Sequence, residues 1–365
     1  MTTSSSRHTE LYCARQLPLL QNQTYPTRTE AQTCATGDVI LVQDHATGLI
    51  YNQAFEPERM HYTAQYQNEQ GLSRSFRLHL EEMRGIIAHH FAGQSLLEVG
   101  CGKGFFLEML QQAGFAITGC DPAYDGVNPA IHKRYFTRDA GLQADALILR
   151  HVLEHVPDPL QFLTNLAAAN HGGWIYLEVP CLDWICRHRT WFDIYYEHVN
   201  YFRLSDFYRM FSRIAAAGHT FGGQYLYVVA DLSSLLSVTN TGRDPFLWPN
   251  DFLATLEHQA AWLQNSPQAV IWGAGSKGVI FALFLQRVGI RFDWVIDINP
   301  AKQNTYLPVT GLRVCAPDEA IPQLHARADI LVMNGNYLDE IQRATRNRFR
   351  YHLVDQPIQT ASPGC

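Results

Sequence analysis

The sequence predicts an α/β protein built on mostly parallel sheets. Between residues 75 and 235, apolar runs of strand length alternate with segments whose apolar residues recur at helical spacing. This alternation indicates a doubly wound sheet with helices on both faces. A second strand, glycine turn and helix begin near residue 268, and they predict a further α/β unit.

The expected elements follow the sequence in order. Strands are predicted at 95–99, 116–120, 146–149 and 174–179, with helices at 75–91, 104–112, 160–169 and 204–217. Strands at 219–222 and 225–230 form a hairpin that closes the sheet with an antiparallel edge. Later come a helix at 251–263 and strands at 268–272, 294–297 and 329–333.

This pattern divides the protein into four segments. Residues 1–74 form a small N-terminal module with β-structure, of which 1–10 are expected to be disordered. The main sheet occupies 75–235, a linker and helix occupy 236–264, and a C-terminal α/β domain occupies 265–365.

Composition excludes several partners. The net charge is −6, and no dense Lys/Arg block exists to follow nucleic-acid phosphates; the basic stretch 343–350 is interpreted as a solvated helix face. The sequence contains no run of 18 apolar residues, so no membrane span is predicted. The polar N-terminal residues lack the apolar core of a secretory signal. Eight scattered cysteines without a C-x-x-C pair favour a reducing cytoplasm. We expect a monomer or homodimer.

The first glycine turn follows a buried strand. Leu96–Val99 runs into Gly100-Cys101-Gly102-Lys103-Gly104 and then a helix. Such glycines let a ligand approach the backbone at the carboxyl end of a strand. Asp121 ends the next strand, where a carboxylate can accept both ribose hydroxyls of an adenosine. A dinucleotide site uses the same parts, and a tight turn without ligand is a further alternative.

Two further features help to distinguish these kinds of site: Glu98, and the residues that follow the strand ending at residue 149. Glu98 precedes a glycine spacing that is not G-x-G-x-x-G, and Arg150-His151-Val-Leu-Glu154-His155-Val follows the later strand. Together they resemble the class I S-adenosylmethionine (SAM)-dependent methyltransferases, which have a Rossmann-like sheet and use SAM as cofactor. The resemblance implies a cofactor site of Glu98, Gly100, Cys101, Gly102, Gly104, Asp121, Pro122, Asp139, Ala140 and His151. A structural role is the alternative for His151 and is favoured for His155.

An aromatic stretch follows the strand at 174–179. It runs from Trp191 to Phe202 and contains Glu197-His198 among tyrosines. A neutral imidazole can take a proton from an acidic carbon, and tyrosine hydroxyls can hold the resulting oxyanion. The alternative is an aromatic packing patch with a capping glutamate.

This stretch resembles the motif of sugar C-methyltransferases, which methylate C3 of a nucleotide-linked keto-deoxysugar. The resemblance implies that His198 is the base and that Glu197 and Tyr195 assist it. The tyrosine-rich segment before the core supplies Tyr62 and Tyr66 to the catalytic set. Tyr196 and Tyr201 are assigned to the substrate.

The C-terminal domain carries a second glycine turn, 273–278, which resembles the same family's C-terminal Rossmann-like domain. A glycine turn at a helix N-terminus can cradle a diphosphate. The substrate-binding candidates here are Gly273, Gly275, Ser276, Lys277 and Asp297. A packing role for the whole domain is the alternative.

The N-terminal module departs from that family, which begins with two zinc-binding C-x-x-C pairs. Here Cys13 and Cys34 stand alone, and Asp44 and Thr47 replace the second pair. A structural zinc site needs about four thiolates or imidazoles, and a mixed site with Asp44 and His45 has poor spacing. We therefore predict a degenerate zinc module without metal, and the departure also leaves the acceptor open.

Three other functions compete with C-methylation of a nucleotide sugar. One is an O- or N-methyltransferase acting on another small metabolite, again with His198 as base. A second is an NAD-dependent oxidoreductase using the 273–278 turn, although few residues remain there for a full dinucleotide fold and a catalytic domain. A third is a non-enzymatic binder with an inactive methyltransferase fold.

Overall fold

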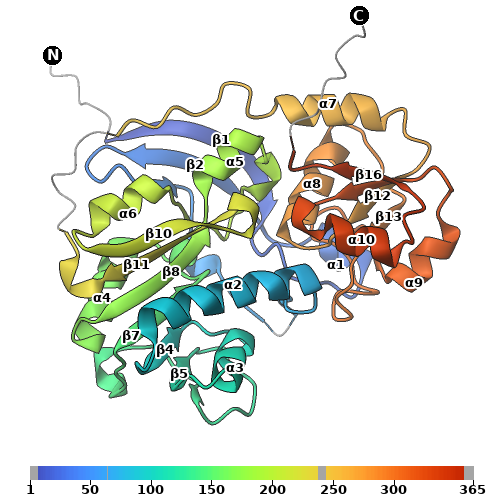
Figure 1. Cartoon of the computed structure of the whole chain (residues 1–365). Coiled ribbons are helices and arrows are strands. Elements are labelled where there is room, and N and C mark those ends of the chain that lie inside the picture. The colour runs from blue at the N-terminus through green and yellow to red at the C-terminus, as the bar shows by residue number, and fades with distance from the viewer. Residues whose placement is uncertain (1–6, 64, 237–243, 357–365) are drawn as a thin grey trace, which may run out of the picture.

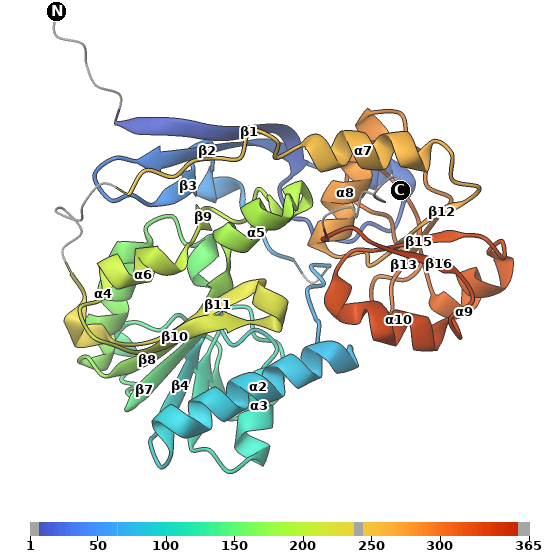
Figure 2. The ribbon, with the colours of Figure 1, turned by 45° about the horizontal axis from the view of Figure 1, so that its top comes forward.

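The structure is a computed structural model that describes residues 7–63, 65–236 and 244–356. The strands of these residues form three sheets, one N-terminal, one central and one C-terminal (Figure 1). The N-terminal sheet lies against one side of the central unit, and the C-terminal unit lies beside both (Figure 2). No helix among the described residues is long and apolar enough to cross a membrane.

The N-terminal sheet is antiparallel and includes a distant strand. Its order is β1 (His8–Pro18), β2 (Thr36–Asp44), β3 (Ile50–Asn52) and β9 (Asn200–Tyr201). The expected disorder over residues 1–10 is wrong at positions 8–10. These polar residues pair with β2, His8 opposite Asp44, because the ladder satisfies their backbone groups. Residues 1–6 lie outside the described part.

The central sheet has the order β10-β11-β8-β7-β4-β5-β6. Its parallel strands are β4 (Leu96–Val99), β5 (Ile117–Cys120), β6 (Ile131–His132), β7 (Ala146–Arg150) and β8 (Trp174–Pro180). The helices α2 (Arg74–Phe91), α3 (Phe105–Gln112) and α4 (Pro159–Asn170) accompany them. The side chains of β4 are buried throughout, as in a sheet covered on both faces. The predicted elements from 75 to 179 are confirmed.

The antiparallel edge differs from the prediction in its first strand. The helix predicted at 204–217 ends early, as α6 (Leu204–Met210), and the backbone then forms β10 (Ile214–Thr220) and β11 (Tyr225–Asp231). The alanines of β10 favour a helix by propensity, but pairing with β11 overrides that preference. The strand predicted at 219–222 is therefore the end of β10 plus a turn.

The C-terminal sheet is parallel, with the order β14-β13-β12-β15-β16. Its strands are β12 (Ala269–Trp272), β13 (Trp294–Ile296), β14 (Val314–Cys315), β15 (Asp329–Val332) and β16 (Arg350–Leu353). Its helices are α7 (Ala254–Leu263), α8 (Ser276–Arg287), α9 (Pro317–Ala320) and α10 (Leu338–Ala344). The basic stretch 343–350 is not one helix face, because α10 ends at Ala344 and β16 begins at Arg350.

Several contacts join the C-terminal unit to the rest, among them an aromatic stack and a hydrogen bond. Trp191 stacks on Phe281 of α8, with ring centroids 5.5 Å apart. Glu340 of α10 accepts a hydrogen bond of 2.8 Å from the hydroxyl of Ser73, which caps α2. The aromatic stretch that follows α5 (Leu182–His188) therefore packs on α8, and its end pairs with β3.

Candidate active site

The first glycine turn lies at the carboxyl edge of the central sheet. Gly100 and Gly104 have φ values of 72° and 83°. A Cβ at Gly100 would lie 2.5 Å from Val152, and one at Gly104 would lie 2.4 Å from Ile131. Both positions therefore require glycine for space as well as for conformation. Nothing lies within 4 Å of a Cβ built on Gly102, so the middle of the turn is open.

Asp121 holds this turn in place. Its carboxylate accepts hydrogen bonds of 2.8 Å from the backbone N–H of Gly102 and of Ala123. Each carboxylate oxygen has further lone pairs, so the same group can also accept ligand hydroxyls. Of the other candidates, Cys101 is buried beneath the turn and Pro122 is exposed. Asp139 and Ala140 lie in the short helix η2 (Arg138–Ala140).

Glu98 is the least solvated acid of the turn. Burial raises the pKa of its carboxyl to about 7, and Oε2 has no hydrogen-bond partner among the described residues. A buried oxygen without a partner is costly, so a cationic group supplied by a ligand would stabilise it.

His151 belongs to a buried charged network at the end of β7. Its Nε2 lies 3.0 Å from Oε1 of Glu178 and its Nδ1 lies 3.3 Å from Oε1 of Glu154. Burial alone would lower the pKa of His151, but the two carboxylates outweigh it and raise the pKa to about 9. Arg150 and His79 also approach Glu178. His151 therefore carries a positive charge near neutral pH.

Glu197 is brought together with the two early tyrosines. It accepts a hydrogen bond of 2.7 Å from the hydroxyl of Tyr66 and one of 3.1 Å from the backbone of Gln21. The ring of Tyr62 meets that of Tyr66 edge-on, with centroids 4.9 Å apart. Burial raises the pKa of Glu197. These bonds go to Gln21 and Tyr66 rather than to His198, so the predicted assistance to the imidazole is not a direct one.

His198 lies between two rings. Its centroid is 4.7 Å from that of Tyr195 and 4.9 Å from that of His155, both edge-on. Burial lowers the pKa of His198 well below its usual value, so the imidazole is neutral at pH 7. The Tyr195 hydroxyl donates a 2.8 Å hydrogen bond to Asp193. A neutral imidazole can accept a proton, as the sequence prediction requires.

Two predicted substrate residues, Tyr196 and Tyr201, have partners within the protein. The hydroxyl of Tyr196 accepts a hydrogen bond from the backbone of Glu56, and its ring fills the space over Gly37. The hydroxyl of Tyr201 is held by the backbone of Tyr195. Both side chains are buried, and their assignment to the substrate stays a prediction.

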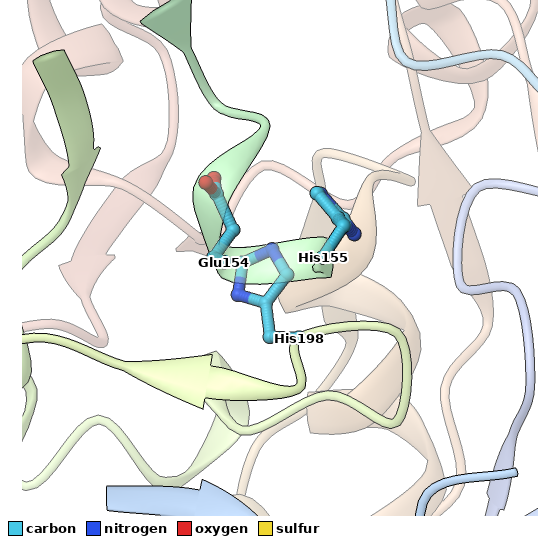
Figure 3. A group of neighbouring side chains, drawn as sticks. All are labelled: Glu154, His155 and His198. Atoms are coloured by element: carbon cyan, nitrogen blue, oxygen red, sulfur yellow. The ribbon is translucent and has the colours of Figure 1, made fainter. Parts of the chain in front are cut away.

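A group of metal-binding type lies at this site. Glu154, His155 and His198 offer ligand atoms that all lie within 4.8 Å of one another (Figure 3). The N-terminal candidates are engaged otherwise: Asp44 caps the turn at Ala46, and Cys13 lies on β1. In the sequence, the only sign of this group is Glu154-His155 at the carboxyl end of β7. The sequence analysis favours a structural role for His155 and therefore does not predict the group.

The second glycine turn lines a cavity of about 270 Å³ between the C-terminal sheet and residues 68–73. All five substrate-binding candidates of the C-terminal domain line it: Gly273, Gly275, Ser276, Lys277 and Asp297. Asp297 accepts backbone hydrogen bonds of 2.8 Å from Ala274 and Asn299, much as Asp121 holds the first turn.

Lysines and amides complete the cavity. Lys302 is buried and donates to the side chain of Asn22 at 2.9 Å and to the carbonyl of Ala274. Lys277 donates to Gln224 at 2.9 Å and lies 3.1 Å from Asp193. The sequence analysis did not assign Lys302, Asn22 or Gln224 to the site, because their shared location depends on long-range packing.

Comparisons with known proteins agree with this geometry. The model of a family described as "Methyltransferase domain" matches residues 60–215. Residues 60–215 are therefore similar to a methyltransferase domain. The protein is 25% identical to the C-methyltransferase NovU of Streptomyces niveus over 291 residues, which is 68% of each protein. It is 33% identical to a ubiquinone biosynthesis O-methyltransferase of Bordetella avium over 107 residues, which are 25% of this protein and 44% of the relative.

Solved structures resemble this methyltransferase domain weakly. An S-adenosylmethionine-dependent methyltransferase from Mesorhizobium loti matches with a TM-score of 0.33 and 13% identity, over 42% of this protein and 97% of that one. The Rossmann-like assignment of the domain rests on its own strand order and crossovers, described above.

SAM is the cofactor that the sequence resemblance implies, and the residues at the first turn fit it. SAM carries an ammonium, a sulfonium and a ribose diol. Glu98 offers a buried oxygen without a partner to a cationic group, the open backbone at Gly102 admits a ligand, and Asp121 can accept ribose hydroxyls. When bound, SAM supplies an electrophilic methyl group.

Proposed function

We propose that this protein methylates a carbon atom of a nucleotide-linked keto-deoxysugar, with His198 as the base. The observation that carries the proposal is a physical connection between the C-terminal cavity and the methyltransferase site. Lys277, on the cavity wall, pairs with Asp193, and Asp193 accepts from Tyr195, whose ring packs on His198. Tyr225, another wall residue, packs on His151 with centroids 4.6 Å apart.

This connection suits an acceptor with two ends. The cavity presents two ammonium groups, Lys277 and Lys302, and the glycine turn at the start of α8, which together suit a diphosphate. Its apolar walls include Trp272, Met333 and Tyr337, which suit a base and ribose. A sugar attached to the diphosphate can then extend toward His198.

The proposed reaction requires the protein to take one proton from the acceptor and to position the two reactants. His198 takes the proton from the carbon next to the sugar carbonyl. The positive charge of His151 favours the resulting oxyanion electrostatically. The carbon then forms its bond to the methyl group, and the carbon–sulfur bond of the donor breaks. The burial of His198 between Tyr195 and His155 keeps its imidazole neutral, so that it can accept a proton.

The first test is the product. Mass spectrometry of reactions with SAM and a panel of nucleotide-linked keto-deoxysugars should show a gain of one methyl, and NMR of the product should place that methyl on carbon. The similarity to a ubiquinone biosynthesis O-methyltransferase covers 25% of this protein, so O-methylation is the rival outcome. A methyl on oxygen, or on a metabolite without a nucleotide, would overturn the proposal while leaving methyl transfer intact.

The second test concerns the role of His198 as the base. His198→Ala should lower turnover by about 10²–10⁴-fold with SAM affinity nearly unchanged, because the group removed acts on the acceptor. Melting temperature, SAM binding and turnover are measured on one preparation, with the exposed His219 on β10 changed to Gln as control. A well-folded His198→Ala protein with wild-type turnover would end the assignment.

A further inference from the structure

Glu154, His155 and His198 converge from two segments. Glu154 and His155 lie in the short helix η3 (Leu153–His155), which follows β7, and His198 precedes β9. Figure 3 shows the three side chains around a common space. Their candidate ligand atoms, two imidazole nitrogens and a carboxylate oxygen, lie within 4.8 Å of one another.

Each of these side chains has a free lone pair. Glu154 is almost fully buried, and its Oε2 has no hydrogen-bond partner among the described residues, while Oε1 faces His151. Nδ1 of His155 lies 2.8 Å from the carbonyl oxygen of Glu197. A carbonyl only accepts, so Nδ1 carries the proton and Nε2 keeps its lone pair. His198 meets the rings of His155 and Tyr195 edge-on.

We propose that Glu154, His155 and His198 form a binding site for a divalent transition metal such as Zn²⁺, and that metal bound there blocks catalysis. Two imidazoles and one carboxylate, with a fourth position left for water, form a ligand set that zinc takes in proteins. The bond from His155 to a backbone carbonyl is the outer contact that orients metal-binding histidines. Tetrahedral ligand atoms lie roughly 3.4 Å apart, so ligand atoms that lie within 4.8 Å of one another approach by at most about 1.4 Å on binding.

The inhibitory role rests on the proposed function. An imidazole nitrogen of His198 that coordinates a metal has no lone pair left to take a proton. His198 therefore cannot bind the metal and act as the base through that nitrogen at the same time. His151 shares Glu154 with the metal through the other carboxylate oxygen, so both contacts can coexist. The acid at position 154 therefore makes the histidine pair a metal site rather than only a proton-accepting pair.

The test measures metal binding without any acceptor. Full-length protein is treated with chelator and titrated with Zn²⁺ by calorimetry, and with Co²⁺ by visible absorption. One ion per protein molecule should bind, and His155→Gln and Glu154→Gln should each weaken binding at least tenfold. His219→Gln removes an exposed histidine elsewhere and should change nothing. SAM binding and melting temperature show that each variant is folded.

Two results would overturn the site: no stoichiometric binding by the wild type, or unchanged affinity in both variants. Stoichiometric binding with turnover that rises when zinc is added would overturn the inhibitory role, because it would make the metal an activator. Turnover that falls with zinc and recovers with chelator supports it. Because the titration needs no acceptor, failure to methylate a nucleotide sugar would overturn the proposed function and leave the metal result standing.

Discussion

At the scale of single residues, one carboxylate can serve both the fold and the ligand. Asp121 fixes Gly102 and is also the acceptor assigned to the ribose. Asp121→Ala should weaken SAM binding by more than about tenfold, since hydrogen bonds to a charged group are worth roughly 1.5–3 kcal/mol. Calorimetry with Asp125→Ala, an exposed acid on the same loop, as control checks this. Equal affinities in both variants would remove Asp121 from the site.

Glu98 gives a pH-dependent prediction. Its pKa rises from an ordinary 4.5 to about 7 on folding, so the folded state binds the proton more tightly than the unfolded state. Glu98 therefore contributes stability below about pH 4.5 that is lost as the pH rises to 7. Glu98→Gln removes this dependence, so its melting temperature relative to wild type should rise from pH 5 to pH 8. A constant difference would show that Glu98 titrates normally.

At the scale of elements, the start of α8 and the loop before β9 are joined by one ion pair. Lys277 and Asp193 are both largely buried, so each depends on the other for compensation. Lys277→Met and Asp193→Asn should each lower turnover of a nucleotide-linked acceptor, with SAM affinity unchanged. In a double-mutant cycle the effects should be strongly non-additive. Additive losses would mean that the two residues act separately.

The elements also show where sequence reasoning succeeds. The turn at Gly100 and the strand before it have a local signature, so their position and the cofactor could be predicted. The strand at 214–217, where the sequence analysis predicts a helix, could not be predicted, because pairing with β11 determines its conformation. Tyr196 and Tyr201 match a motif but are held by Glu56 and Tyr195 through tertiary contacts that no spacing reveals.

At the scale of the whole molecule, Ser73 and Glu340 connect α2 to α10. The Ser73 hydroxyl donates to Glu340 and also accepts from the N–H of Phe76 as the helix cap. Glu340→Ala removes the first bond and also the 3.2 Å hydrogen bond that Glu340 accepts from the backbone of Ser75, whereas Ser73→Ala removes both bonds of the Ser73 hydroxyl. The free energy of unfolding should fall in both variants, and the lost cap alone should cost Ser73→Ala about 1 kcal/mol. Chemical denaturation measures it, and an unchanged free energy of unfolding in Ser73→Ala would show that the cap adds nothing.

The pairing of β3 with β9 sets an order of events during synthesis. β3 ends at Asn52, but its partner is made only when residues 200 and 201 emerge from the ribosome. At ordinary elongation rates the edge of β3 waits on the order of 10 s for that partner. An unpaired strand edge invites association with other proteins. The segment that carries His198 therefore also ends the vulnerable period of the nascent N-terminal sheet.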